Sequence, residues 1–302
     1  MATNADPGPP GTSALIKRHS LATRLWHWIT AVCLLVLLTS GLQIFNAHPS
    51  LYWGSDSDFD SPFLSIGARR DANGDPMGYV SIEGLQIPTT GVLGWSSVNG
   101  HMQARAFPAW ATLPGPQWLS LGRHWHFTAA WVFGVLLVFY LLYSIVSRRR
   151  RRLIGVHRGE MGRFGHEVVK HATLRFSRAR SYNIIQKLTY LTVLFVLLPL
   201  MVLTGLTMSP TMDAAWPWLT EVFGGRQSAR TLHFLCAFAL VAFFLVHLLL
   251  VLISGVLNNM RAMITGGYQT DGQTDGWADD RADAAPAGTH GANAEERHHG
   301  QR

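Results

Sequence analysis

Charged side chains are scarce in this chain, and their scarcity is the first constraint on its class. Only 14% of the 302 residues are Asp, Glu, Lys or Arg. Four apolar stretches of about 20 residues, the length that spans a bilayer, run over residues 25–45, 127–146, 188–206 and 232–253. This pattern excludes an ordinary soluble domain. It predicts an all-α integral membrane protein, a four-transmembrane-helix bundle in the lipid bilayer.

Cysteine is also scarce, and its placement excludes two kinds of chemistry. Cys33 and Cys236 both fall within predicted helices, where they read as small apolar packing residues rather than as a disulfide. There is no Cys-x-x-Cys-His motif, so covalent c-type haem is not expected. The sequence shows no cleavable signal peptide and no credible nucleophile or acid–base pair, so we assign no catalytic residue.

The basic residues are concentrated in a few places and predict the orientation in the membrane. The segment between the second and third spans is rich in arginine, and Lys17, Arg18 and Arg24 precede the first span. Loops rich in Lys and Arg are usually cytoplasmic, so both termini are predicted to be cytoplasmic. The net charge of +7 is thus explained by topology. No basic folded module suggests nucleic-acid binding.

The remaining segments complete the predicted domain plan. Residues 1–14 and the polar tail 266–302 are expected to be disordered, and 15–265 form the membrane domain. The external loop 46–122 is long, with one short strand possible at 78–84. Its aromatic residues suit a membrane-interface belt and a docking surface equally well; they are Trp53, Trp95, Trp110 and Trp118.

The most informative residues are histidines within or near the spans. His233 and His247 are fourteen residues apart, nearly four helical turns, so they point to the same side and lie roughly 20 Å apart. His27 is at the cytoplasmic end of the first span, and His124 and His126 are at the external end of the second. Matching depths pairs His27 with His247, and His126 or His124 with His233.

Two histidine pairs at two depths predict two bis-histidine haem sites, because imidazole is a common axial ligand of haem iron. Ligand sites in bundles form between facing helices. A metal-transport path is the main rival, but it usually adds carboxylates, which the span interiors lack. Three arginines each precede a candidate ligand by three residues, where they bind haem propionates or lipid headgroups: Arg24, Arg123 and Arg230. Three glycines either admit the macrocycle or allow close helix packing: Gly41, Gly134 and Gly205.

Several motifs together resemble the bacterial di-haem cytochrome b family, over about residues 15–265. Its members include the membrane subunits of formate dehydrogenase, nickel–iron hydrogenase and thiosulfate reductase. The motifs are Arg-Leu-Trp-His-Trp at 24–28, His-Pro-Ser-Leu-Tyr-Trp-Gly at 48–54, Arg-His-Trp-His-Phe at 123–127, Tyr-Asn-Ile-Ile-Gln-Lys at 182–187, and Arg-Thr-Leu-His-Phe at 230–234 with His247. The resemblance implies two b haems, the inner one held by His27 and His247 and the outer one by His126 and His233.

The resemblance also implies a quinone site beside the inner haem. It would use Asn183, Gln186 and Lys187 at the start of the third span, because amide side chains can hydrogen-bond a quinone carbonyl. The alternative is that Asn183 is an ordinary N-cap of that helix.

The expected function is electron transfer in the bacterial inner membrane. The chain would link the quinone pool to a periplasmic oxidoreductase subunit, with a molybdopterin enzyme favoured and a hydrogenase the other candidate. A stand-alone transmembrane reductase of ferric iron or another small acceptor is the first alternative. A haem-free transporter or anchor is the second. Enzyme activity, if any, would be quinone-reactive and belong to a complex.

Overall fold

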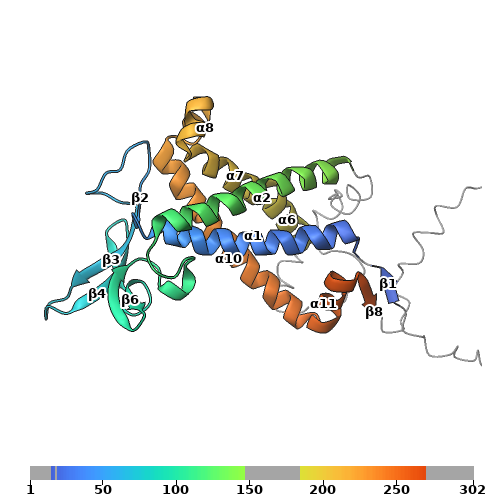
Figure 1. Cartoon of the computed structure of the whole chain (residues 1–302), viewed down its shortest axis with the longest axis horizontal. Coiled ribbons are helices and arrows are strands. Elements are labelled where there is room, and N and C mark those ends of the chain that lie inside the picture. The colour runs from blue at the N-terminus through green and yellow to red at the C-terminus, as the bar shows by residue number, and fades with distance from the viewer. Residues whose placement is uncertain (1–14, 18, 147–183, 270–302) are drawn as a thin grey trace, which may run out of the picture.

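The computed structural model describes residues 15–17, 19–146 and 184–269 (Figure 1). Among them, four helical segments are long and apolar enough to cross a membrane: Leu21–Phe45, Leu119–Val146, Leu188–Thr207 and Arg226–Ile253. The predicted helical membrane bundle is therefore confirmed, but the predicted all-α class is wrong, because the segment between the first two spans folds into strands. The predictions for residues 1–14 and for most of the tail, from 270 onward, lie outside the described residues, as does the arginine-rich segment 147–183.

The four spans pack as two pairs. Helix α1 packs along α2, and α7 packs along α10. The spans are α1 (Leu21–Phe45), α2 (Leu119–Val146), α10 (Arg226–Ile253) and a third made of α6 (Ile184–Thr192), a π-helical turn η2 (Val193–Leu197) and α7 (Leu198–Thr207). Helices α1, α2 and α10 begin four to eight residues before the stretches predicted from composition, because apolar length marks only the hydrocarbon core while a helix continues into the polar interface.

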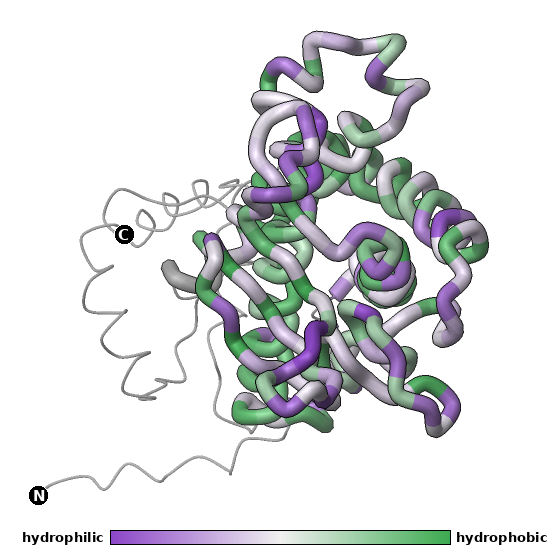
Figure 2. The backbone as a smooth tube through the Cα atoms, turned by 90° about the vertical axis from the view of Figure 1, so that its left-hand side faces the viewer, coloured by the Kyte–Doolittle hydropathy of each residue, from purple (hydrophilic) through white to green (hydrophobic). Residues whose placement is uncertain are grey.

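The helices carry their polar side chains inside and their apolar side chains outside. Ser40 and Thr204 have no exposed surface, whereas Leu35 is 63% and Phe139 67% exposed. The tube in Figure 2 shows the predominantly hydrophobic sequence of these helices. This arrangement suits a lipid environment, because the apolar side chains face the lipid. The backbone polar groups are hydrogen-bonded within each helix and need no water.

The segment predicted as a long external loop is largely folded. An antiparallel sheet has the order β2-β3-β4-β5, and β6 and β7 form a hairpin beside it. The strands are β2 (Ser50–Leu51), β3 (Leu64–Arg70), β4 (Pro76–Ile82), β5 (Leu85–Pro88), β6 (Gly94–Val98) and β7 (His101–Arg105), followed by the short helix η1 (Ala109–Ala111). The strand expected at 78–84 is thus β4, displaced by two residues, and it has five companions that the sequence did not reveal.

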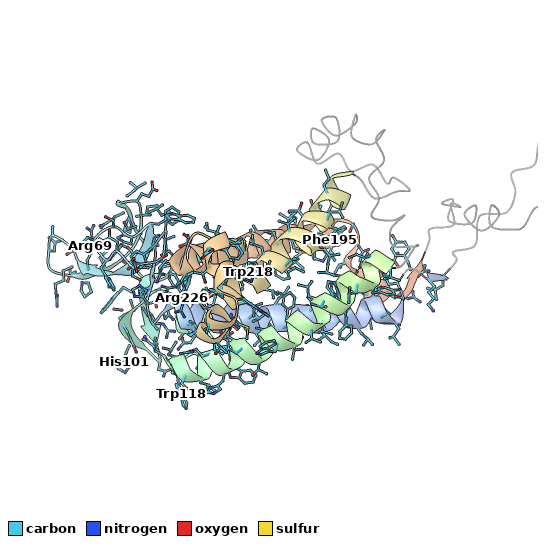
Figure 3. The ribbon with its side chains drawn as sticks, turned by 90° about the horizontal axis from the view of Figure 1, so that it is seen from above. Arg69, His101, Trp118, Phe195, Trp218 and Arg226 are labelled. Atoms are coloured by element: carbon cyan, nitrogen blue, oxygen red, sulfur yellow. The ribbon has the colours of Figure 1, made fainter. Side chains whose placement is uncertain are left out.

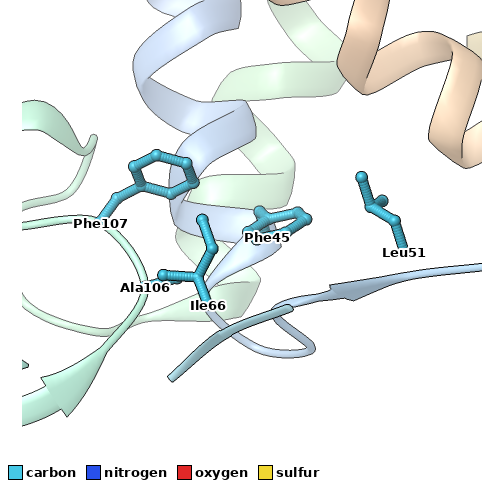
Figure 4. Packing of buried hydrophobic residues seen from close by; sticks show 5 residues of the cluster. All are labelled: Phe45, Leu51, Ile66, Ala106 and Phe107. Atoms are coloured by element: carbon cyan, nitrogen blue, oxygen red, sulfur yellow. The ribbon is translucent and has the colours of Figure 1, made fainter. Parts of the chain in front are cut away.

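A small apolar core joins this strand region to the C-terminal end of α1. Phe45 of α1 packs with Leu51, Ile66, Ala106 and Phe107, all at most 6% exposed (Figure 4). Burial of such side chains contributes about 1.5–3 kcal/mol each. The strand region is therefore packed onto the bundle rather than tethered to it by a free linker.

A buried arginine strengthens the same junction. Arg105 is 5% exposed, and burial lowers the pKa of its guanidinium. It donates to Phe107 O at 2.6 Å, Thr112 Oγ1 at 3.0 Å and Gly115 O at 3.0 Å, and it reaches Gln43 Oε1 on α1 at 3.3 Å. Four neutral acceptors surround the cation, so its burial depends on this network remaining complete.

The two ends of the described chain lie side by side at the other end of the bundle. Strand β1 (Leu15–Lys17) pairs antiparallel with β8 (Gly267–Gln269), which follows helix α11 (Val256–Thr265). β8 lies beyond the predicted domain boundary at residue 265. Figure 3 shows Arg69 and His101 at the opposite, strand-bearing end. Short helices α8 (Pro210–Ala215) and α9 (Pro217–Val222) connect α7 to α10. Which end faces the cytoplasm remains a prediction.

Candidate functional site

Four histidines from three helices come together as two facing pairs. The ring centres of His126 on α2 and His233 on α10 are 6.3 Å apart, with the rings inclined at 63°. The ring centres of His27 on α1 and His247 on α10 are 6.4 Å apart, with the rings inclined at 52°. Helix α10 contributes one histidine to each pair, as its fourteen-residue spacing predicts. The first pair is called the outer pair and the second the inner pair.

Buried hydroxyl groups contact both histidines of the outer pair. Nδ1 of His126 lies 3.1 Å from Ser40 Oγ and 3.1 Å from the carbonyl oxygen of Leu37. Nδ1 of His233 lies 3.0 Å from Thr204 Oγ1. With Nδ1 engaged in this way, Nε2 of each ring is left to bind a metal, and such outer contacts orient a metal-binding imidazole.

Each histidine of the inner pair lies beside an aromatic ring. Trp28 lies edge-on to His27 at 5.3 Å, and Phe243 stacks on His247 at 5.8 Å. Nδ1 of His27 is buried and has no hydrogen-bond partner among the described residues. The two pairs therefore differ in their immediate surroundings.

The structure separates the two candidate histidines of α2. His124 is exposed, and its Nδ1 contacts the carbonyl oxygen of Ser120 on its own helix at 2.9 Å. His126 alone faces α10. The geometry therefore favours His126 over His124 as the partner of His233.

The three arginines near these histidines have different surroundings. Arg24 donates to the carbonyl oxygen of Ile264, and Arg230 donates to that of His48. Arg123 is exposed, with its guanidinium 5.5 Å from the ring centre of Phe127. Arg24 and Arg230 thus connect distant segments to the helices that carry the paired histidines.

The glycines in the spans are not equivalent. A Cβ on Gly41 would lie 3.3 Å from Cε1 of His126, and one on Gly205 would lie 3.4 Å from Cε1 of His233. A Cβ on Gly134 would meet nothing within 4 Å. Gly41 and Gly205 therefore give room to the outer histidine rings.

The candidate quinone residues are described only in part. Gln186 lies in the first turn of α6, while Asn183 lies outside the described residues. Their assignment to a quinone site stays a prediction.

His48, which follows the C-terminal end of α1, had no separate role in the predictions from sequence. Its ring stacks on Tyr52 at 5.6 Å, and its backbone oxygen accepts the bond from Arg230. Nε2 of His48 is buried without a hydrogen-bond partner in the described part of the chain. Burial, and then the positive charge of Arg230, lower the pKa of this imidazole. The only signal in the sequence was its place in the motif at 48–54.

Comparison with known proteins assigns this helical membrane bundle to a family. A family model described as prokaryotic cytochrome b561 matches residues 18–266. The chain belongs to this family. It is therefore a multi-pass protein of the bacterial inner membrane that binds haem b and transfers electrons. This confirms the predicted resemblance, its location and its general function.

One curated relative of this cytochrome b561 chain comes from Azospira oryzae. It is named as the YedZ1 subunit of a protein-methionine-sulfoxide reductase, an assignment that its name gives as provisional. The two are 31% identical over 258 residues, which cover 82% of this chain and 96% of the relative. No solved structure matches the chain.

Both histidine pairs fit a haem on geometric grounds. Two imidazoles that bind one metal ion from opposite sides, through bonds of about 2 Å, hold their ring centres about 6 Å apart. The outer pair is at 6.3 Å and the inner pair at 6.4 Å. In the described part of the chain, no three His, Cys, Asp or Glu side chains gather as a metal site. The four histidines therefore form two pairs, the arrangement that bis-histidine haem ligation requires.

Proposed function

We propose that this chain is a di-haem b subunit that carries electrons across the membrane, between the quinone pool at the inner end and an external oxidoreductase. The observation that supports it best is the pair of histidine pairs at two depths, each with the spacing of a bis-imidazole site. His27 with His247 would hold the inner haem, and His126 with His233 the outer one. Bound haem supplies one-electron redox chemistry, and its axial ligands help to set the potential.

In this function the helices hold the two redox sites at a fixed separation and exclude water from between them. The ligands on α10 are fourteen residues apart, about 21 Å along the axis. A buried apolar cluster packs the helices together: Cys33, Phe133, Leu137 and Leu198. Such packing excludes water and fixes the relative positions of the helices.

The quinone would react at the inner end, where Asn183 and Gln186 would hydrogen-bond its carbonyl groups. Oxidation of a quinol releases two electrons and two protons. The motif at 182–187 supports this position through its resemblance to the di-haem family.

The external partner would dock at the strand-bearing end. The provisional name of the Azospira oryzae relative supports a reductase that acts on protein methionine sulfoxide. That reaction takes two electrons and two protons, breaks the S–O bond and releases water, leaving methionine. Electrons would then flow outward from quinol. The resemblance favours a molybdopterin enzyme as the partner, with a hydrogenase as the other candidate.

The first experiment is a reduced-minus-oxidised visible spectrum of the purified chain, with haem and protein both quantified. We expect low-spin b-type bands and about two haems per chain. His247→Ala should remove the inner haem and stop quinone reaction, whereas His233→Ala should remove the outer haem. One haem per chain in the unmodified protein, or two in either variant, would overturn the di-haem assignment.

The quinone position is tested separately with Asn183→Ala. We expect both haems to remain and the rate of quinol-dependent haem reduction to fall. Unchanged quinol kinetics would remove Asn183 from the site. The stand-alone alternative predicts that the purified chain alone reduces a small acceptor such as ferric citrate as fast as membranes that contain the chain and its partner. That result would replace the partner-dependent function with a stand-alone reductase.

A further inference from the structure

The contacts of the outer pair repeat on two helices that are far apart in sequence. Ser40-Gly41 on α1 faces His126, and Thr204-Gly205 on α7 faces His233. In each case a hydroxyl residue contacts Nδ1 of the imidazole, and the glycine that follows it faces Cε1 of the same ring. These two dipeptides are called the hydroxyl–glycine seats.

The hydroxyl protons in both seats are already committed. Ser40 Oγ donates to Val36 O at 2.5 Å, and Thr204 Oγ1 donates to Leu200 O at 2.6 Å. A hydroxyl has one proton and two lone pairs. The contact with imidazole is therefore one in which Nδ1–H donates and the hydroxyl oxygen accepts. His126 shares this donor with the carbonyl oxygen of Leu37 at 3.1 Å, and His233 shares it with the carbonyl oxygen of Met201. This fixes the tautomer that leaves Nε2 free to bind a metal.

The glycines fix the position of the same rings. A Cβ at residue 41 or 205 would come within 3.3 or 3.4 Å of Cε1 of the facing histidine, tighter than or at the limit of ordinary contact. The lack of a side chain lets each ring approach its hydroxyl. The hydrogen bond at Nδ1 and the close contact with the glycine at Cε1 thus constrain two neighbouring atoms of the same imidazole ring.

An ordinary role of the hydroxyls does not explain this arrangement. Ser and Thr often bond back to a carbonyl one turn earlier in the helix, and Thr207 does so, donating to Leu203 O at 2.9 Å. Thr207 is 1% exposed, and among the described residues its hydroxyl forms this bond within its own helix and no hydrogen bond to a histidine. Nδ1 of His27 in the inner pair has no hydrogen-bond partner among the residues that the structure describes. The seats belong to the outer pair.

We infer that the two hydroxyl–glycine seats are positioning elements for the outer haem, which orient both axial ligands and lower the midpoint potential of that haem relative to the same site without them. A hydrogen bond from Nδ1–H makes the imidazole a stronger donor to the metal, and this favours the oxidised ion. The inference rests on the proposed function, in which His126 and His233 hold the outer haem.

The test is a redox titration of the purified protein that resolves its two haems, with the inner haem as internal reference. Thr204→Val removes the hydroxyl and keeps the branched shape. We expect two haems, an upward shift of the outer midpoint potential only, and a changed low-spin electron paramagnetic resonance signal of that haem. Ser40→Ala should act in the same direction. Thr204→Ser should restore the original values.

The matched control is Thr207→Val, the same change one turn further along α7, where we expect no shift. If Thr204→Val lost the outer haem while Thr204→Ser and Thr207→Val kept it, the seat would also be supported. Two haems with unshifted potentials and signals in both Thr204→Val and Ser40→Ala would overturn this inference alone. Fewer than two haems in the unmodified chain would instead overturn the proposed function.

Discussion

At the scale of single residues, the clearest choice is between the two histidines of α2. Residues two apart on a helix point about 200° away from each other, so only one of them can face α10. His126 lies opposite His233, whereas His124 contacts its own helix at Ser120.

We therefore expect His126→Ala to lower the haem content from two to one per chain, and His124→Ala to leave two. The two variants are matched, because they remove the same side chain two positions apart. Haem quantification on the purified proteins measures the result. The opposite outcome would move the ligand to His124.

The four paired histidines were predictable from sequence, because helical spacing and depth depend only on residue number. The seats were not predictable. Ser40 and Thr204 look the same as Thr207 in a sequence, since any hydroxyl in a helix can bond to its own backbone. Only the rotation of α1 against α2 and of α7 against α10 shows which hydroxyl meets a histidine.

At the scale of elements, the spans were predictable and the strands were not. A run of apolar residues identifies a membrane helix almost by itself. The strands from β2 to β7 have two to seven residues each, and β5 and β7 are exposed along almost their whole length, so they show no alternation of buried and exposed positions. Their stability comes instead from packing against the bundle, through residues such as Phe45 and Phe107.

The contact between the segment 48–54 and the start of α10 depends on one glycine. Gly225 precedes the helix with a φ of 112°, and the backbone amides of Gln227 and Ser228 donate to Gly54 O at 3.0 and 3.1 Å. A Cβ on Gly225 would lie 2.3 Å from that same oxygen. Helix α10, which carries one histidine of each pair, is thus anchored to the segment 48–54 through its first turn.

We expect Gly225→Ala to destabilise the protein by about 2 kcal/mol or more, because it adds a clash to the strain of a positive φ. Gly100→Ala is the control, since Gly100 has a φ of 83° and open space around its Cβ position. It should cost only the strain, about 1 kcal/mol. Thermal unfolding of the detergent-solubilised variants would measure the difference. Equal losses in the two variants would show that the close approach at Gly54 is not needed.

At the scale of the whole molecule, the fold has two unlike ends. The strand region is held to one end of the bundle by an apolar core and the network of Arg105, while β1, β8 and α11 lie at the other. Strands β1 and β8 bring the first and last described segments together at that end. That both termini are cytoplasmic stays a prediction, which rests on the retention of basic loops in the cytoplasm.

The orientation can be measured with single cysteines, because the chain's own Cys33 and Cys236 are buried. Asp75 is exposed between β3 and β4, and Lys17 is exposed in β1. We expect Asp75→Cys to react with a membrane-impermeant maleimide in intact spheroplasts. Lys17→Cys should react only after lysis, because the basic residues near it should stay in the cytoplasm. The unmodified chain controls for labelling of the native cysteines. Labelling of Lys17→Cys but not Asp75→Cys in intact spheroplasts would invert the molecule, placing the histidine pair with the hydroxyl seats beside the cytoplasm and the strand region out of reach of any periplasmic partner.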